Sequence, residues 1–340
     1  MNHVAIDLHD EYSQICVMSP QRDILMEAKI PTSKAAMREF FRGRERCRVI
    51  YEAGPHALWV SELLEELGHE PIACHARRLR MIAESRNKND RVDAELIARL
   101  SLSDLELIRP IHQRSRETLD ERSIVSTRAS LVETQKVLRT KLRGLVKPFG
   151  VRLSRGTKIA LSEAATVKLP PGLRISVDAL LAVLNTIALQ MRGLDQAIEQ
   201  IADRPDTNHM KTIPGIGPLI SVAYRDTIED PARFTPKDVA AYIGLTPSNR
   251  SSAGKKLPSK ERGQPGNPYV RSLLIQAAWT LVNSRSDSAL ARWGRLKIKQ
   301  IGSKKGAVAI ARKLAVLMHH LWLHNEDFVP HPSQRSRRAA

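Results

Sequence analysis

The sequence predicts an α/β domain at the N-terminus, followed by a long helical middle and a mostly helical C-terminal domain. Three observations lead to this prediction. Short apolar runs joined by tight turns open the chain, strand-like and helix-like segments then alternate, and two long stretches with heptad spacing lie further on. With 340 residues, the chain is long enough for more than one domain with a sizeable core.

The N-terminal domain is predicted to span residues 1–110. Ser33 is expected to cap a helix that runs through Arg42, and Gly68 to end a helix over 58–67. Further helices are expected from about 77 to 101. The expected strands are residues 3–9, 12–19, 22–30, 48–52 and 71–74. Three antiparallel strands followed by alternating helix and strand are typical of a ribonuclease-H-like sheet.

A helical, coiled-coil segment is predicted over residues 111–205. Apolar residues recur there at steps of three and four, over 131–145 and again, for three heptads, over 180–201. The segment between them, 148–171, is rich in Gly, Pro and basic residues and is expected to be a loop. Two long helices and a loop predict a helical hairpin. Heptads alone leave open whether the seam packs inside the hairpin or forms a subunit interface.

The C-terminal domain is predicted over residues 206–328. Its segment Ile213-Pro-Gly-Ile-Gly-Pro218 precedes an apolar helix and is similar to a helix-hairpin-helix turn, whose glycines let backbone N–H groups approach phosphate. A plain helix-helix turn fits the same letters. Further helices are expected over 234–244, 268–284 and 305–324. The basic tail, 329–340, is expected to be disordered.

The overall charge favours a polyanionic partner. Lys and Arg number 54 against 36 Asp and Glu, which gives a net charge of +18, and nucleic acid is the partner that this balance favours over a membrane. Cys16, Cys47 and Cys74 form no CxxC pair, so neither a zinc knuckle nor a disulfide framework is expected. A reduced, cytosolic compartment is expected, with neither a signal peptide nor a membrane-spanning segment.

Four carboxylates in the N-terminal domain are the candidate metal ligands. Asp7 lies inside an apolar run and Glu52 ends another, and an acid in such a place is costly unless it is paired or bound to a metal. Asp90 and Asp93 share one helix face. Alone, these two would also fit a solvated face and Glu52 a helix start. Together the four acids match a magnesium site for phosphodiester chemistry, with Lys88 and Arg91 as nearby phosphate contacts.

A polar loop in the C-terminal domain holds the other candidate residues. Ser251 and Ser252 stand among basic residues that could bind phosphates: Arg250, Lys255 and Lys256. A serine hydroxyl can attack phosphorus if a base removes its proton and cations or a metal stabilise the developing charge. Composition alone favours a phosphate-binding Ser/Gly linker over a nucleophile.

These motifs resemble the DEDD transposases of insertion-sequence family one-ten over nearly the whole chain. The N-terminal likeness lies in Asp7, in Tyr51-Glu-Ala-Gly54 and in Lys88-Asn-Asp-Arg-Val-Asp-Ala94. The C-terminal likeness lies in Ile213-Pro-Gly-Ile-Gly217, Tyr242-Ile-Gly-Leu-Thr-Pro247 and Gly266-Asn-Pro-Tyr-Val-Arg-Ser-Leu-Leu274. The resemblance implies a RuvC-like nuclease domain and a transposase domain that carries a catalytic serine.

The resemblance also implies a mechanism. Asp7, Glu52, Asp90 and Asp93 would bind Mg²⁺, and Ser251, with Ser252 as the adjacent alternative, would form a phosphoserine bond to a cut DNA strand. The partners implied are donor and target double-stranded DNA, a structured guide RNA encoded by the element, and further copies of the chain in dimers and tetramers. The site of action would be the bacterial cytosol, at the nucleoid.

Two other hypotheses stay open at the level of sequence. A RuvC-like junction resolvase would need the same four acids, but it would use water as nucleophile and leave Ser251 dispensable. A non-catalytic helix-hairpin-helix protein that binds DNA or RNA would need no magnesium, and Asp7→Asn would bind as well as the wild type.

Overall fold

The computed structural model describes residues 1–74, 90–103, 110–154, 156–246, 251–252, 255–256 and 266–331. Contacts group the chain into two compact units, Met1–Arg116 and Glu117–Ala340. The finer division at residues 110, 205 and 328 remains our proposal.

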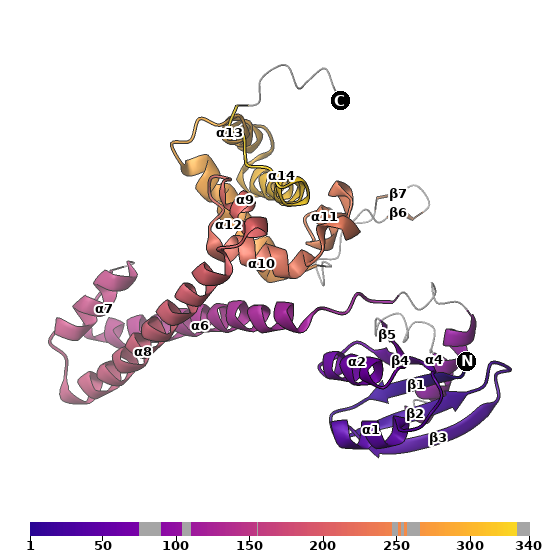
Figure 1. The fold of residues 1–340 in the computed structure, drawn as a ribbon. Coiled ribbons are helices and arrows are strands. Elements are labelled where there is room, and N and C mark those ends of the chain that lie inside the picture. The colour runs from indigo at the N-terminus through magenta and orange to yellow at the C-terminus, as the bar shows by residue number, and fades with distance from the viewer. Residues whose placement is uncertain are drawn as a thin grey trace. The chain divides into compact units, whose positions relative to one another are not determined.

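The N-terminal unit is built on a mixed five-stranded sheet with the order β3-β2-β1-β4-β5 (Figure 1). Its strands are β1 (His3–Leu8), β2 (Tyr12–Met18), β3 (Ile24–Pro31), β4 (Arg48–Glu52) and β5 (Glu70–Cys74). The first three strands pair antiparallel, whereas β4 is parallel to both β1 and β5. All five predicted strands are confirmed to within two residues at each end, and the arrangement is compatible with a ribonuclease-H-like domain.

Helices cover both faces of this sheet. On one face α1 (Lys34–Phe41) and α2 (Ala57–Glu66) bury Phe41 and Leu64 against Ile6 and Tyr51. On the other face α4 (Asp90–Ser103) packs its alanines and isoleucine against the strands. Ser33 caps α1 as predicted, because its hydroxyl accepts a hydrogen bond from the backbone N–H of Ala36 at 3.2 Å. Residues 75–89, where helix was also predicted, lie outside the described part.

A helical hairpin begins the second unit, formed by α6 (Arg116–Val146) and α8 (Pro171–Ile201). Leu142 and Val146 of α6 pack with Val177, Leu181 and Leu184 of α8 in one buried cluster. The predicted hairpin is therefore present, and part of the seam, which the heptads left open, packs inside it. The expected loop between the helices was wrong in part: η1 (Lys147–Phe149) and α7 (Thr157–Thr166) lie there, and α7 buries Ala164 in the same cluster.

Within the described residues, one helix has the length and composition to cross a membrane. The most apolar 18-residue window of α8 has a mean hydropathy of 1.6, and 22% of that window is buried. No uninterrupted apolar run of that length exists in the sequence, which is why the pattern predicted none. Because part of the apolar surface of α8 packs against α6 and α7, one such helix carries little weight. The absence of a membrane partner stays a prediction.

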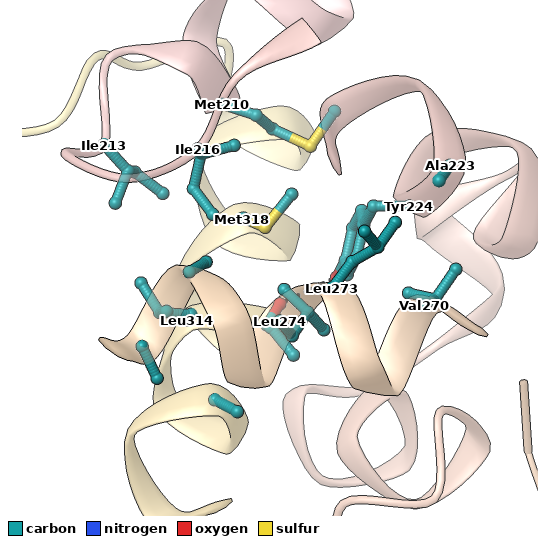
Figure 2. Close-up of a cluster of buried hydrophobic side chains, with 14 of the residues drawn as sticks. Met210, Ile213, Ile216, Ala223, Tyr224, Val270, Leu273, Leu274, Leu314 and Met318 are labelled. Carbon is teal, nitrogen blue, oxygen red and sulfur yellow. Dashed lines mark hydrogen bonds between the residues drawn. The ribbon is translucent and has the colours of Figure 1, made fainter. Parts of the chain in front are cut away.

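The rest of the second unit is a cluster of helices around one core. They are α9 (Pro205–Lys211), α10 (Pro218–Ile228), η2 (Pro231–Arg233), α11 (Pro236–Tyr242), α12 (Pro268–Asn283), α13 (Ala289–Ile301) and α14 (Ser303–His324). Figure 2 shows side chains from several of these helices meeting in the core, among them Met210, Tyr224, Leu274 and Met318. The Tyr224 hydroxyl donates a hydrogen bond to the carbonyl oxygen of Ala315 at 2.7 Å, which joins α10 to α14.

Buried charges join the hairpin to this core. Arg225 of α10 forms ion pairs with Glu121 of α6 and, at 2.8 Å, with Asp226. Arg204 also reaches Glu121 at 2.9 Å. Burial raises the pKa of Asp226 to about 6 even though Arg225 lies beside it. This network fixes the start of α6 against α10, because each buried charge would be costly without its partner.

Gly215 in the predicted phosphate-binding turn has a packing role. Its φ is +93°, and a Cβ there would stand 3.1 Å from the carbonyl oxygen of Ala277 in α12. In the turn between α9 and α10, glycine thus permits close approach to α12, and phosphate binding by this turn stays a prediction.

Candidate active site

Asp7 and Glu52 come together at one edge of the parallel strand pair. The register of β1 and β4 aligns Ile6 with Tyr51, so Asp7 and Glu52 are the next positions on adjacent strands. Neighbouring strands lie about 4.8 Å apart. Both acids stand at the carboxyl ends of their strands, where α/β sheets bind ligands.

Both acids belong to the sheet face that α4 covers. Side chains alternate between the faces of a strand. Ala5 and Ile50 lie in the cluster with Ala94 and Ile97 of α4, whereas Ile6 and Tyr51 lie in the cluster on the opposite face. Asp7 lies two positions after Ala5, and Glu52 lies two positions after Ile50. Because residues two apart on a strand share a face, both acids belong to the sheet face that α4 covers.

Asp90 and Asp93 occupy the first turn of α4. Ala94, Ile97 and Ala98 of α4 form a stripe that packs on the sheet. By helical spacing, Asp90 and Asp93 extend this stripe by one turn toward the start of the helix. The structure gives backbone positions alone for Asp90, Arg91 and Asp93, and Lys88 lies outside the described residues. Among the side chains that are described, no three metal-ligating groups gather into a site.

Asp7 has a mostly buried carboxylate with a histidine partner. Its side chain is 16% exposed, and its Oδ2 lies 3.1 Å from Nε2 of His9. His9 in turn packs against Tyr12, with ring centroids 5.1 Å apart. A mostly buried carboxylate beside a second one is the hard-oxygen donor set that suits Mg²⁺. The residues therefore fit a divalent ion, with His9 as a contact that the sequence reading did not single out.

Ser251 lies in a short β-ribbon in the C-terminal unit. The strands β6 (Ser251–Ser252) and β7 (Lys255–Lys256) pair antiparallel, with Ser251 opposite Lys256 and Ser252 opposite Lys255. Residues directly opposite each other in such a pair have Cβ atoms about 5 Å apart. These four residues thus form a ribbon within the segment, and phosphate binding by the segment stays a prediction. Arg250 lies outside the described part of the chain.

The two ends of the segment that carries Ser251 lie in close contact. Gly266, with φ +104°, lies against the backbone of Ile243 and Gly244 just after α11. Asn267 then caps α12 by accepting hydrogen bonds from the N–H groups of Tyr269 and Val270, at 3.0 and 3.3 Å. Its Nδ2 donates to the hydroxyl of Thr227 at 3.1 Å. The chain leaves the helical core and returns to it at one point.

Comparisons with known proteins agree with this division. Residues 4–149 match a transposase family model, that of the IS110 DEDD type, and residues 207–293 match the model of the transposase IS116/IS110/IS902 family. The first match contains the four acids, and the second contains Ser251.

Relatives with curated names extend the similarity. The chain is 27% identical over 254 residues to "Transposase for insertion sequence element IS1111A" of Coxiella burnetii, covering 71% of this chain and 68% of the relative. It is 25% identical over 329 residues to "Probable family 20 transposase" of Pseudomonas aeruginosa, covering 94% and 96%. The chain therefore belongs to the IS110 family of DEDD transposases, which are enzymes of DNA recombination.

Proposed function

We propose that this transposase is an RNA-guided, site-specific recombinase that joins itself to DNA through Ser251. The backbone pairing of Ser251 with Lys256 supports the proposal, because it puts a serine and a lysine at opposing positions of one ribbon. The DEDD family implies a requirement for divalent metal. The nucleophile, the identity of the ion and the guide are our inferences.

Asp7, Glu52, Asp90 and Asp93 would hold Mg²⁺. When bound, the ion would supply Lewis-acid stabilisation of charge on the scissile phosphate. The neighbouring positions of Asp7 and Glu52, and the placement of Asp90 and Asp93 at the start of α4, support this assignment. His9 would orient the Asp7 carboxylate through the 3.1 Å contact.

The serine step is a transesterification. The Oγ of Ser251 forms a bond to phosphorus as the bond from phosphorus to a DNA oxygen breaks. The serine loses its proton, and the DNA oxygen that leaves gains one. One phosphoester replaces another, so the ester is kept for rejoining. Lys255, Lys256 and Arg250 would neutralise charge on the phosphate.

A denaturing gel tests this step. Wild-type protein incubated with labelled donor DNA and Mg²⁺ is expected to give a protein-linked band that Ser251→Ala removes. Ser252→Ala is the matched control and should keep the band. Cleavage without any protein-linked band, unaffected by both changes, would instead support the water-dependent resolvase.

Guidance by RNA is a separate part of the proposal. The net charge of +18 favours polyanions, and the resemblance to the family implies a structured RNA from the element. Sequencing of nucleic acid that co-purifies with the protein is expected to return one element-encoded RNA. A random mixture of cellular RNAs would contradict guidance while leaving the serine step intact.

We also propose that the hairpin supports dimers and tetramers, in the bacterial cytosol at the nucleoid. The helix α8 exposes Ile175, Val183 and Leu189, which are 72, 48 and 55% exposed, although much of the seam is turned toward α6. Exposed apolar residues on a long helix favour association. Light scattering should show a mass that falls when Val183 and Leu189 are changed to Gln. A monomeric wild type would contradict this assembly.

A further inference from the structure

A groove in the second unit combines an apolar floor with a basic rim. It has a volume of about 750 Å³ and lies along α14, between Leu245 after α11 and Trp293 of α13. Val308 and Val316 of α14 complete the floor. Gly306 sets this geometry, because a Cβ there would stand 2.8 Å from Cα of Ile298, and only glycine lets α14 approach α13 so closely.

The rim carries four exposed cations: Lys304, Lys305, Arg312 and Lys313. Within the described parts of the chain, none of the four has a carboxylate partner. The sequence contains no Asp or Glu between Ser288 and Glu326, so no acid on α13 or α14 offsets this charge. The Lys313 Nζ lies 4.5 Å from the centre of the Trp293 ring, which draws that cation over the floor. A polyanion complements such a rim.

The groove also lies within reach of the proposed nucleophile. Leu245, in its wall, precedes Ser251 by a few positions, and a chain of that length spans at most about 20 Å. A phosphate chain held on the rim would therefore pass near the segment that carries Ser251.

We propose that this groove binds a single DNA strand, with phosphates on the rim cations and sugars or unpaired bases on the floor. Duplex DNA would offer phosphates to the rim but keep its base faces stacked and away from the apolar floor. The inference builds on the proposed strand exchange, which would release an unpaired strand beside Ser251. A duplex that contacted the rim alone would leave Val308, which is 39% exposed, and the half-buried Trp293 in water.

Anisotropy of a labelled oligothymidylate, titrated at several salt concentrations, tests the groove. Each phosphate contact on a single strand contributes about 0.7 to the slope of log K against log salt. Lys304→Gln with Lys305→Gln is expected to lower that slope by about 1.4 and to weaken binding about tenfold or more near 0.1 M salt. Lys141→Gln with Arg192→Gln removes the same charge from exposed positions on the hairpin and should change the slope far less.

Val308→Ser probes the floor separately, since it should weaken oligothymidylate binding without changing the salt slope. Equal slopes for the groove variant and the hairpin control would overturn the inference. Tighter binding of oligouridylate, lost in the same variant, would assign the groove to RNA and overturn the DNA assignment. Capture of an acidic amphipathic peptide instead, with oligothymidylate binding unchanged, would also overturn it.

The outcomes separate this inference from the proposed function. If the groove variant binds oligothymidylate with wild-type salt dependence while the adduct still depends on Ser251, the proposed function holds and the groove proposal fails. If the adduct survives Ser251→Ala and Ser252→Ala while the groove variant shows the predicted change in slope, the groove proposal holds and the proposed function fails.

Discussion

Gly266 lies so close to Ile243 that a Cβ built on it would stand 2.4 Å from the carbonyl carbon of Ile243. With φ at +104°, the position is also one that L side chains rarely adopt. This contact closes the segment that carries Ser251, and it ties both ends of that segment to the helical core. The contact explains why glycine precedes Asn267, the cap of α12.

Gly266→Ala is expected to destabilise the protein by about 2–4 kcal/mol, because both the backbone clash and the positive φ penalise a side chain. Urea unfolding measures the change. Gly150→Ala is the matched control: its φ is +76°, in the left-handed region, but nothing lies within 4 Å of the new Cβ, so about 1–2 kcal/mol is expected. Equal costs at the two positions would show that the contact with Ile243 is unimportant.

Asp7→Asn keeps the shape of the side chain but removes the charge that a metal ion needs. DNA cleavage is expected to fall more than about 100-fold, which exceeds the usual effect of changing a residue that hydrogen-bonds to a metal ligand. His9→Gln removes a residue of that kind, so the rate of DNA cleavage should fall about 10- to 100-fold and recover in part at high Mg²⁺. Gel assays over a range of Mg²⁺ concentrations measure both. A His9 variant as impaired as Asp7→Asn, without recovery, would argue against an orienting role.

Leu184 is fully buried in the cluster that joins α8 to α6 and α7. Leu184→Ala is expected to destabilise the second unit by about 2–5 kcal/mol through lost burial and a cavity. Val137 of α6 is 65% exposed, so Val137→Ala should change stability by less than about 0.5 kcal/mol. Thermal unfolding at low protein concentration compares them. A small effect of Leu184→Ala would mean that the hairpin does not depend on this cluster.

The raised pKa of Asp226 predicts that the stability of the protein depends on pH. Its pKa of about 6 in the folded protein exceeds the usual 3.8, so the folded state holds the proton more tightly than the unfolded chain. Ionisation of Asp226 therefore lowers stability as the pH rises from about 4 to about 6, and the loss stays constant above that range. Relative to the wild type, Asp226→Asn should gain on the order of 3 kcal/mol between pH 4 and pH 7. A stability difference that does not change with pH would contradict this cause.

The elements that could be predicted from sequence are those whose own residues carry the signal. Ser33 caps α1 with its own hydroxyl, and the apolar run Val49–Tyr51 is buried on both sheet faces. The helix α13 was missed, because basic residues interrupt its apolar positions and its buried side depends on packing with α14. The helix α7 was hidden in a stretch whose Gly and Pro residues suggested a loop.

The candidate site was predictable in its residue types and less so in its contacts. The apolar run around Asp7 indicates a buried strand, which singles out its carboxylate. The contact with His9 depends on the turn after β1, for which the sequence offers only the pair His9-Asp10. Strands as short as β6 and β7 lack a period that sequence can reveal, so the pairing of Ser251 with Lys256 could not be predicted.

The proposed serine mechanism is tested most directly by the identity of the residue that becomes joined to DNA. Protein trapped on donor DNA in the presence of Mg²⁺ can be digested with protease and nuclease, and the nucleotide-linked peptide sequenced by mass spectrometry. We expect a phosphoester on Ser251, absent from Ser251→Ala and from Asp7→Asn. A modified residue outside Ser251 and Ser252, or strand cleavage with no linked peptide at all, would contradict it.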